Sequence, residues 1–199
     1  MLYAPQMLLI GSAGQNAGKT TVASAVIQAW KAFPPDTPER LPLTALKITT
    51  VARQPGVCPR GGSGCGACTG ITGDFVLEAE QGQSPNKDTA TLLQAGADQV
   101  FWLRARTLSL KAAYIHFLTQ IPPQGLIICE SNSLREAVVP GCFIMLLKAS
   151  EIKPSARRVQ GFADMVLSAK DLPAALDSLV SRLQVMREAD GAVRVRLAC

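Results

Sequence analysis

Short uninterrupted apolar runs alternate along this chain with segments whose apolar residues are spaced as on one face of a helix. The first run, Met7–Ile10, is followed at residues 22–30 by apolar side chains that recur every three or four positions. Such a run is typical of a buried strand, and such a spacing is typical of an amphipathic helix. Because the alternation continues to the end of the chain, we predict an α/β protein with a mostly parallel sheet covered by helices on both faces.

The remaining elements follow from the same patterns. Further strands are predicted at residues 44–50, 99–103, 126–129, 143–147 and 165–167, and helices at residues 74–81, 88–95, 108–120 and 171–187. Asp171 stands where it can cap the last of these helices. The tail, residues 192–197, alternates apolar residues with arginines and therefore predicts an edge strand with the arginines outward.

Residues 52–73 interrupt the pattern. They are rich in glycine, hold three cysteines and have no apolar face. Loops of this length in compact domains are usually functional or disordered. We therefore expect a single domain, residues 1–199, with a glycine- and cysteine-rich inserted loop at about residues 52–73.

A glycine-rich segment joins the first strand to the first helix. It reads Gly14-Gln15-Asn16-Ala17-Gly18-Lys19-Thr20-Thr21 and has the Gly-Lys-Thr end of a phosphate-binding loop, although Ala13 stands at the motif's first glycine. Glycines let consecutive N–H groups turn toward phosphate oxygens, and the start of a helix favours an anion. We expect Lys19 to reach the β- and γ-phosphates of a nucleoside triphosphate and Thr20 to ligate its Mg2+. The fold is then the three-layer P-loop NTPase fold; the alternative is a chance glycine turn before a helix.

Two charged residues stand at predicted strand ends, the edge of an open parallel sheet where ligands collect. Glu130 ends the apolar run 126–129 and leads into Ser131-Asn132-Ser133, and Lys47 lies near the end of strand 44–50. A carboxylate at Glu130 can hold the Mg2+ or orient an attacking water. The alternative for Glu130 is an ordinary strand-end carboxylate in solvent.

Several of these segments together resemble the molybdopterin-guanine dinucleotide biosynthesis protein B family, a branch of the P-loop GTPases. The likeness extends over roughly residues 6–148 and rests on residues 14–21, Leu46-Lys47, Lys87-Asp88-Thr89, Ala95-Gly96-Ala97 and Ile127–Glu130. The resemblance implies that the nucleotide is GTP, with ATP still open, and that the protein assists the attachment of GMP to molybdopterin, often as a dimer.

The resemblance also assigns residues. It places phosphate binding on Gly14, Gly18, Lys19, Thr20 and Thr21, and the acidic element on Glu130. Lys47 and Asp88 match weaker family positions that face the substrate. Their alternative reading is a strand-end lysine and a helix-capping aspartate.

The chain departs from this family in two places. Ile48-Thr49 follow Lys47 where the family usually has a histidine, and the family's pattern lacks the inserted Cys58-x6-Cys65-x2-Cys68 loop. Three thiolates on a glycine loop can converge on Zn2+ or an iron–sulfur cluster. A fourth ligand would have to come from Asp74, another cysteine, a small molecule or a second protomer. Free thiols on a flexible loop are the alternative.

Composition narrows the remaining choices. The net charge is +5, and the arginines are scattered rather than gathered with aromatic residues, so nucleic acid is not an expected partner. Neither an apolar segment of membrane-spanning length nor a signal-peptide pattern is present, and we expect a cytoplasmic protein without a membrane partner. Cys129 and Cys142 lie within apolar strands and are predicted to be small core residues.

These observations support three functional hypotheses. The first is a slow, Mg2+-dependent GTPase with Lys19 and Glu130 as catalytic residues, serving molybdenum-cofactor biosynthesis or insertion together with a molybdenum enzyme or assembly protein. The second is a nucleotide-switched metal or iron–sulfur binding protein that delivers a cofactor to a client enzyme. The third is a small-molecule kinase.

Ser168-Ala169-Lys170 resembles the last guanine-contact loop of GTPases.

Overall fold

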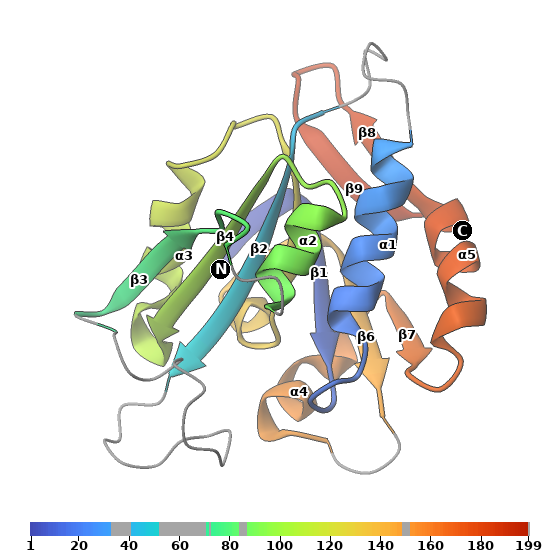
Figure 1. Cartoon of the computed structure of the whole chain (residues 1–199), viewed down its shortest axis with the longest axis horizontal. Helices are drawn as coiled ribbons and strands as arrows, with labels where there is room; N and C mark the ends of the chain where they lie inside the picture. Colours follow the sequence, from blue (N-terminus) through green and yellow to red (C-terminus); the bar gives the residue numbers. More distant parts are fainter. Residues whose placement is uncertain (33–40, 52–70, 72, 84–86, 149–151, 199) are drawn as a thin grey trace.

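A seven-stranded sheet with helices on both faces forms the body of the protein (Figure 1). The computed structural model describes residues 1–32, 41–51, 71, 73–83, 87–148 and 152–198. The strands of this sheet are β1 (Leu2–Ser12), β2 (Leu43–Val51), β3 (Phe75–Ala79), β4 (Gln99–Arg106), β5 (Leu126–Glu130), β6 (Val138–Leu147) and β7 (Met165–Ser168). Their order is β3-β4-β2-β5-β1-β6-β7. All neighbours pair in parallel except β3 and β4, which are antiparallel. The predicted mostly parallel α/β architecture is confirmed.

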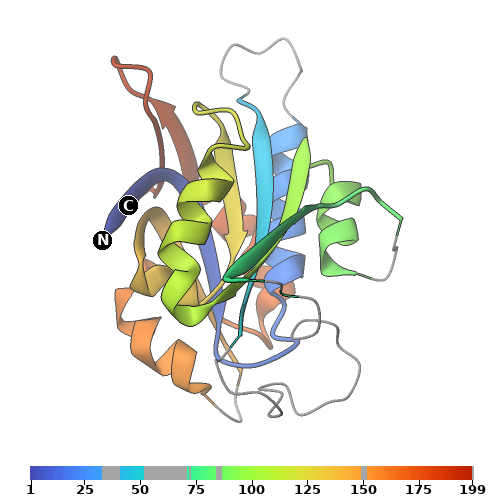
Figure 2. The ribbon, with the colours of Figure 1, turned by 90° about the vertical axis from the view of Figure 1, so that its left-hand side faces the viewer.

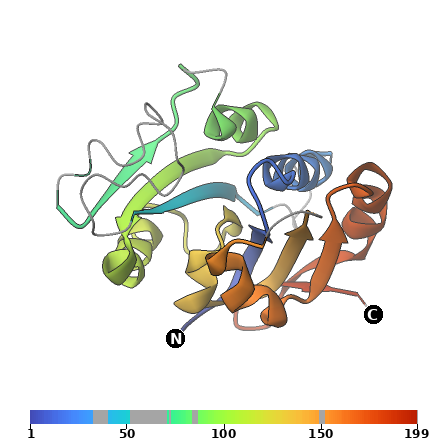
Figure 3. The same cartoon turned by 90° about the horizontal axis from the view of Figure 1, so that it is seen from below.

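The helices divide into two layers, as Figure 3 shows from below. One layer contains α1 (Lys19–Lys31), α2 (Asp88–Gln94) and α5 (Leu172–Arg182). The other contains α3 (Leu110–Leu118) and α4 (Pro154–Val159), with the short 3-10 helix η2 (Ser133–Glu136). The short 3-10 helices η1 (Thr107–Ser109) and η3 (Gln160–Phe162) precede α3 and follow α4. Each layer covers its own apolar cluster, so the sheet is buried on both faces.

The uninterrupted apolar runs of the sequence are the central strands. Every residue from Met7 to Ile10 and from Leu126 to Glu130 is buried. Successive strand residues alternate between the two clusters: Leu8 and Ile10 face α1, whereas Met7 and Leu9 face α3. Because both faces are covered, the usual alternation of apolar and polar residues is absent from these strands.

Two predicted helices are wrong, one of them in part. Residues 74–81 form strand β3, which lies along β4 with Leu77 opposite Leu103. The helix predicted at 171–187 ends at Arg182, and residues 183–187 form β8 (Leu183–Arg187). Asp171 occupies the cap position of α5 but makes no capping hydrogen bond with its side chain.

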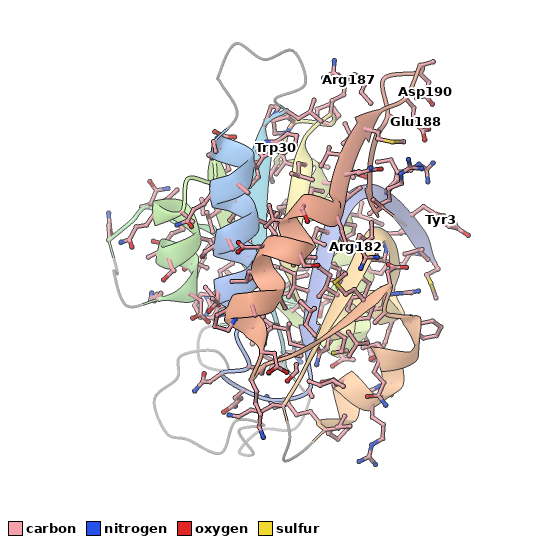
Figure 4. All side chains as sticks on the ribbon, turned by 90° about the vertical axis from the view of Figure 1, so that its right-hand side faces the viewer. Tyr3, Trp30, Arg182, Arg187, Glu188 and Asp190 are labelled. Atoms are coloured by element: carbon pink, nitrogen blue, oxygen red, sulfur yellow. The ribbon has the colours of Figure 1, made fainter. Side chains whose placement is uncertain are left out.

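The tail is a strand, but it lies outside the main sheet. β9 (Val193–Leu197) pairs with β8 in a separate two-stranded sheet. Val193 and Val195 are buried and Arg194 and Arg196 are exposed, as the alternation predicts. Figure 4 shows this hairpin, with Arg187 and Asp190 near its tip.

Within the described ranges, no helix combines the length and the apolar character that crossing a membrane requires.

Candidate functional site

The turn from β1 into α1, residues 13–18, is here called the glycine loop. Ala13 ties it to the sheet, since its N–H donates to the Leu146 carbonyl at 2.8 Å and its carbonyl accepts from the Lys153 N–H at 2.9 Å. Two residues have left-handed backbone conformations: Asn16 with φ 51° and Gly18 with φ 91°. Asparagine and glycine are the residues that tolerate this region best.

The N–H groups of Gly14 to Gly18 point to an anion site. Gly18 is the cap residue of α1 and provides no side-chain capping bond. Residues 15–16 form a hydrogen-bonded turn, and none of the described residues accepts a hydrogen bond from the N–H groups of Gly14, Gln15, Asn16 and Gly18. Backbone N–H donors without acceptors at the start of a 13-residue helix are groups that could bind phosphate oxygens.

Lys19 extends back over this loop. Its Nζ donates to the Ser12 Oγ at 2.7 Å, and the Ser12 Oγ donates to the Gly14 carbonyl at 2.8 Å. Asn132, which follows β5, fixes Ser12 from the other side, because its Oδ1 accepts from the Ser12 N–H at 2.8 Å and its Nδ2 donates to the Ser12 carbonyl at 2.9 Å. The sequence pattern missed Ser12 and Asn132 as site residues, although the polar stretch after the run 126–129 was a signal for Asn132.

Glu130 lies beside the loop and is buried, with 3% of its surface exposed. Its neighbours in the sheet are Ile10 of β1 and Lys47 of β2, which lie directly opposite it. Thr20 Oγ1 donates to its Oε2 at 3.3 Å, whereas Oε1 has no hydrogen-bond partner in the described part of the chain. Glu130 is therefore not a solvated strand-end carboxylate.

Burial raises the pKa of Glu130 above its usual value, and the charges of Lys47 and Lys19 and the Thr20 hydrogen bond oppose that rise. A buried carboxylate with an orphaned oxygen next to a threonine hydroxyl fits a divalent cation. Thr20 and Glu130 are the protein groups that would hold Mg2+, with phosphate and water oxygens completing its shell.

Lys47 and Asp88 meet. The Lys47 ammonium and the Asp88 carboxylate form an ion pair that links β2 to the start of α2. Asp88 is the first residue of α2, and Lys87 holds the cap position, so Asp88 is not the cap residue. The pair lies next to Glu130, since Lys47 and Glu130 are register partners on β2 and β5.

A cavity of about 710 Å3 opens beside Lys19 and Ser12. Its walls come from the end of β2, the region around the start of α3, the η2 segment and α4. Figure 2 shows α3 and α4 on this side of the sheet, away from α1. The cavity was not foreseen, because its lining residues are far apart in the sequence.

The loop between β7 and α5 lies on the other side of the glycine loop. A Cβ placed on Gly18 would stand 2.5 Å from the Leu172 Cδ2, so the first residue of α5 is directly against Gly18. Ser168-Ala169-Lys170 thus connects β7 to a helix that contacts the glycine loop.

The remaining candidate residues divide into three groups. Gln15, Asn16 and Thr21 are exposed, and Ala17 is buried. Cys129 and Cys142 are buried free thiols, which confirms them as core residues. Cys58, Cys65 and Cys68 lie outside the described residues. Among the residues that the structure does describe, no three His, Cys, Asp or Glu side chains gather as a metal site would require.

Comparisons of the chain with protein-family models, curated proteins and solved structures find no match.

Proposed function

We propose that the protein is a Mg2+-dependent P-loop NTPase that binds GTP and serves the biosynthesis or insertion of a molybdenum cofactor. One observation carries the nucleotide site: the glycine loop at the start of α1, the Lys19 ammonium bonded to Ser12 and the Thr20–Glu130 pair lie together at the carboxyl ends of β1 and β5. The choice of GTP and of molybdenum cofactor rests on the family resemblance of residues 6–148.

The chemistry proposed for this site is attack of water on the γ-phosphate. The loop N–H groups and the Lys19 ammonium stabilise the negative charge that develops on the phosphate oxygens. Mg2+, when bound, offsets charge on the β- and γ-phosphates. Glu130 is buried beside Thr20, where its carboxylate can orient the attacking water.

Direct binding of fluorescent GTP and ATP analogues, with and without Mg2+, tests the nucleotide site. We expect Lys19→Ala to weaken binding at least tenfold, and Thr20→Val and Glu130→Gln to remove most of the Mg2+ dependence. Arg187→Ala is the control, because this exposed cation stands on the hairpin (Figure 4), at the opposite end of the molecule from the glycine loop (Figure 1). Equal binding by all variants would refute the proposal.

The cofactor role needs its own measurement. GTP-dependent attachment of GMP to molybdopterin by the partner enzyme, assayed with and without this protein, should increase when the protein is added. If GTP binds but attachment does not change, the nucleotide site stands and the molybdenum role fails.

A second candidate function, nucleotide-switched metal delivery, is favoured by the order of segments along the chain. β2 ends at Val51, which lines the cavity beside Lys19, and the segment with Cys58, Cys65 and Cys68 continues from there. Iron, sulfide and zinc contents of protein purified without oxygen test this candidate. Bound metal that Cys65→Ser removes would support it, and metal-free protein that also fails reconstitution would eliminate it.

A further inference from the structure

The cavity beside Lys19 has a basic lining. Among the described residues that line it, four are basic, Lys19, Lys111, Lys153 and Arg158, and one is acidic, Glu136. Arg158 and Glu136 form an ion pair at 3.0 Å, so the Glu136 charge is already offset. The Lys111 ammonium makes no ion pair or hydrogen bond with any described residue. The cavity therefore offers positive charge to a ligand.

Polar groups that can bind oxygen atoms stand beside these cations. Thr50 at the end of β2 and Ser133 of η2 share a hydrogen bond of 2.9 Å, and both line the cavity. Asn132 lines it as well, and its side chain is already fixed against Ser12. Charged donors together with hydroxyl groups are the usual partners of a phosphate group.

Apolar residues line the same cavity as well: Val51, Leu108, Leu110 and Pro154. Its volume, about 710 Å3, lies within the range of small-molecule sites. A ligand that suits both the basic and the apolar lining residues has an anionic group and an apolar or planar body.

This cavity is distinct from the nucleotide site although the two are adjacent. They share Ser12 and Lys19, but residues 13–18 of the glycine loop do not line the cavity. The other walls belong to the layer of α3 and α4, on the opposite face of the sheet from α1.

We propose that the cavity binds a second small molecule, an organic phosphate with an apolar body, whose phosphate is held by Lys111, Lys153 and Arg158. The position next to Lys19 makes this molecule the second substrate, a role that rests on the proposed nucleotide function. Binding of the phosphate itself does not depend on a nucleotide.

Pyridoxal 5′-phosphate is a suitable probe, because it combines a phosphate monoester, a planar ring and an aldehyde. A neutral lysine amine adds to the aldehyde carbon, water leaves, and borohydride reduces the resulting imine to a stable secondary amine. Peptide mapping by mass spectrometry then identifies the labelled lysines. The full chain is labelled over a range of probe concentrations, with and without Mg2+ and a non-hydrolysable GTP analogue.

We expect saturable labelling of Lys111 or Lys153 that excess phenyl phosphate prevents and the GTP analogue leaves in place. Arg158→Ala should raise the half-saturating probe concentration about tenfold, the loss expected for one charge-assisted hydrogen bond. Arg157→Ala is the matched control, since Arg157 is exposed on the same helix but does not line the cavity.

Labelling spread over exposed lysines, without saturation and without protection by phenyl phosphate, would overturn the proposal. Labelling confined to Lys19 and blocked by the GTP analogue would also overturn it, while leaving the nucleotide site intact. Saturable labelling of the cavity lysines in a protein that binds no nucleotide would support the phosphate site and refute the proposed function alone.

Discussion

Glu130 is a buried carboxylate whose ionisation depends on its surroundings. Its folded pKa is raised by burial, so the folded protein keeps a proton that the unfolded chain has released. Between the unfolded pKa, near 4.5, and the raised folded pKa, stability therefore falls as pH increases. Any cation that binds the carboxylate offsets this loss.

We predict that Glu130→Gln removes this fall in stability with rising pH in protein free of Mg2+ and nucleotide. Urea denaturation from about pH 3 to pH 8 measures the fall, which lies above the unfolded pKa near 4.5, and also covers the acidic range below it, where the Glu80 contribution is lost. Glu80→Gln is a control in which the pH dependence of stability has the opposite sign. The hydrogen bond from Thr89 lowers the pKa of Glu80, so the stability that the Glu80 carboxylate contributes is lost on acidification. Parallel pH profiles for wild type and Glu130→Gln would contradict the prediction.

Gly18 and Gly14 differ in how well their positions can accept a side chain. Gly18 has a left-handed φ of 91° and lies against Leu172, whereas a Cβ on Gly14 would meet only the Lys148 side chain at 3.8 Å. We predict that Gly18→Ala costs about 1–2 kcal/mol of stability, from the left-handed backbone, and weakens nucleotide binding. Gly14→Ala should stay within about 0.5 kcal/mol of wild type, as substitutions without strain or lost contacts do. Urea denaturation and nucleotide titration of both variants check this, and equal losses would show that the loop conformation does not require Gly18.

At the scale of elements, β1 and β6 meet at an irregularity. Ala4 lies opposite Pro140 and Leu8 opposite Cys142, so residues 5–7 of β1 stand opposite Gly141 alone. Strand β9 crosses at the same place. A Cβ on Gly141 would stand 2.0 Å from the Pro5 carbonyl oxygen and 2.6 Å from that of Val195.

We predict that Gly141→Ala destabilises the protein by about 2–3 kcal/mol, because backbone atoms of two strands must move apart. Gly161→Ala is the matched control: no atom lies within 4 Å of its Cβ position, and it should change stability by less than about 0.5 kcal/mol. Thermal or urea denaturation compares the two. A Gly141→Ala variant as stable as the control would refute the close packing of β9 on β1 and β6.

The wrongly predicted elements share one physical cause. Residues 74–81 contain good helix formers, yet Phe75–Ala79 pair along β4, where Glu78 forms an ion pair with Arg104. Residues 183–187 keep the helical spacing of α5 but pair with β9. The sequence does contain a pattern typical of a hairpin turn between β8 and β9, namely Asp190-Gly191, and the glycine has a φ of 81°. Strand pairing depends on a partner distant in the sequence, so it overrides local preference.

At the scale of the whole molecule, the proposed nucleotide site joins elements spread over the first 130 residues of the chain: β1 and α1, β2, α2 and β5. A ligand that binds only the folded protein stabilises all of them together. We predict that Mg2+ with GTP at a hundred times its dissociation constant adds about 2.7 kcal/mol and raises the melting temperature by roughly 5–10 °C.

Differential scanning fluorimetry at several GTP concentrations measures this shift. Lys19→Ala should reduce the shift to about half or less, as a loss of at least tenfold in affinity requires, and Arg187→Ala should keep it. A full shift in Lys19→Ala would place the nucleotide elsewhere on the molecule.

The sequence by itself determined the class of the fold and the glycine loop. Both depend on local patterns: apolar runs that only a doubly covered strand can bury, and a Gly-Lys-Thr segment between a strand and a helix. It also determined that Glu130 ends a buried strand. These features need no information about which strands become neighbours.

Only the tertiary structure decided the sheet order and the environment of the site residues. It placed Lys47 opposite Glu130, joined Lys47 to Asp88, set Asn132 against Ser12 and formed the basic cavity. Each of these contacts joins residues that are more than 40 positions apart or collects them from several elements. Contacts of this kind depend on chain topology and on long-range pairing, and local propensity does not encode them.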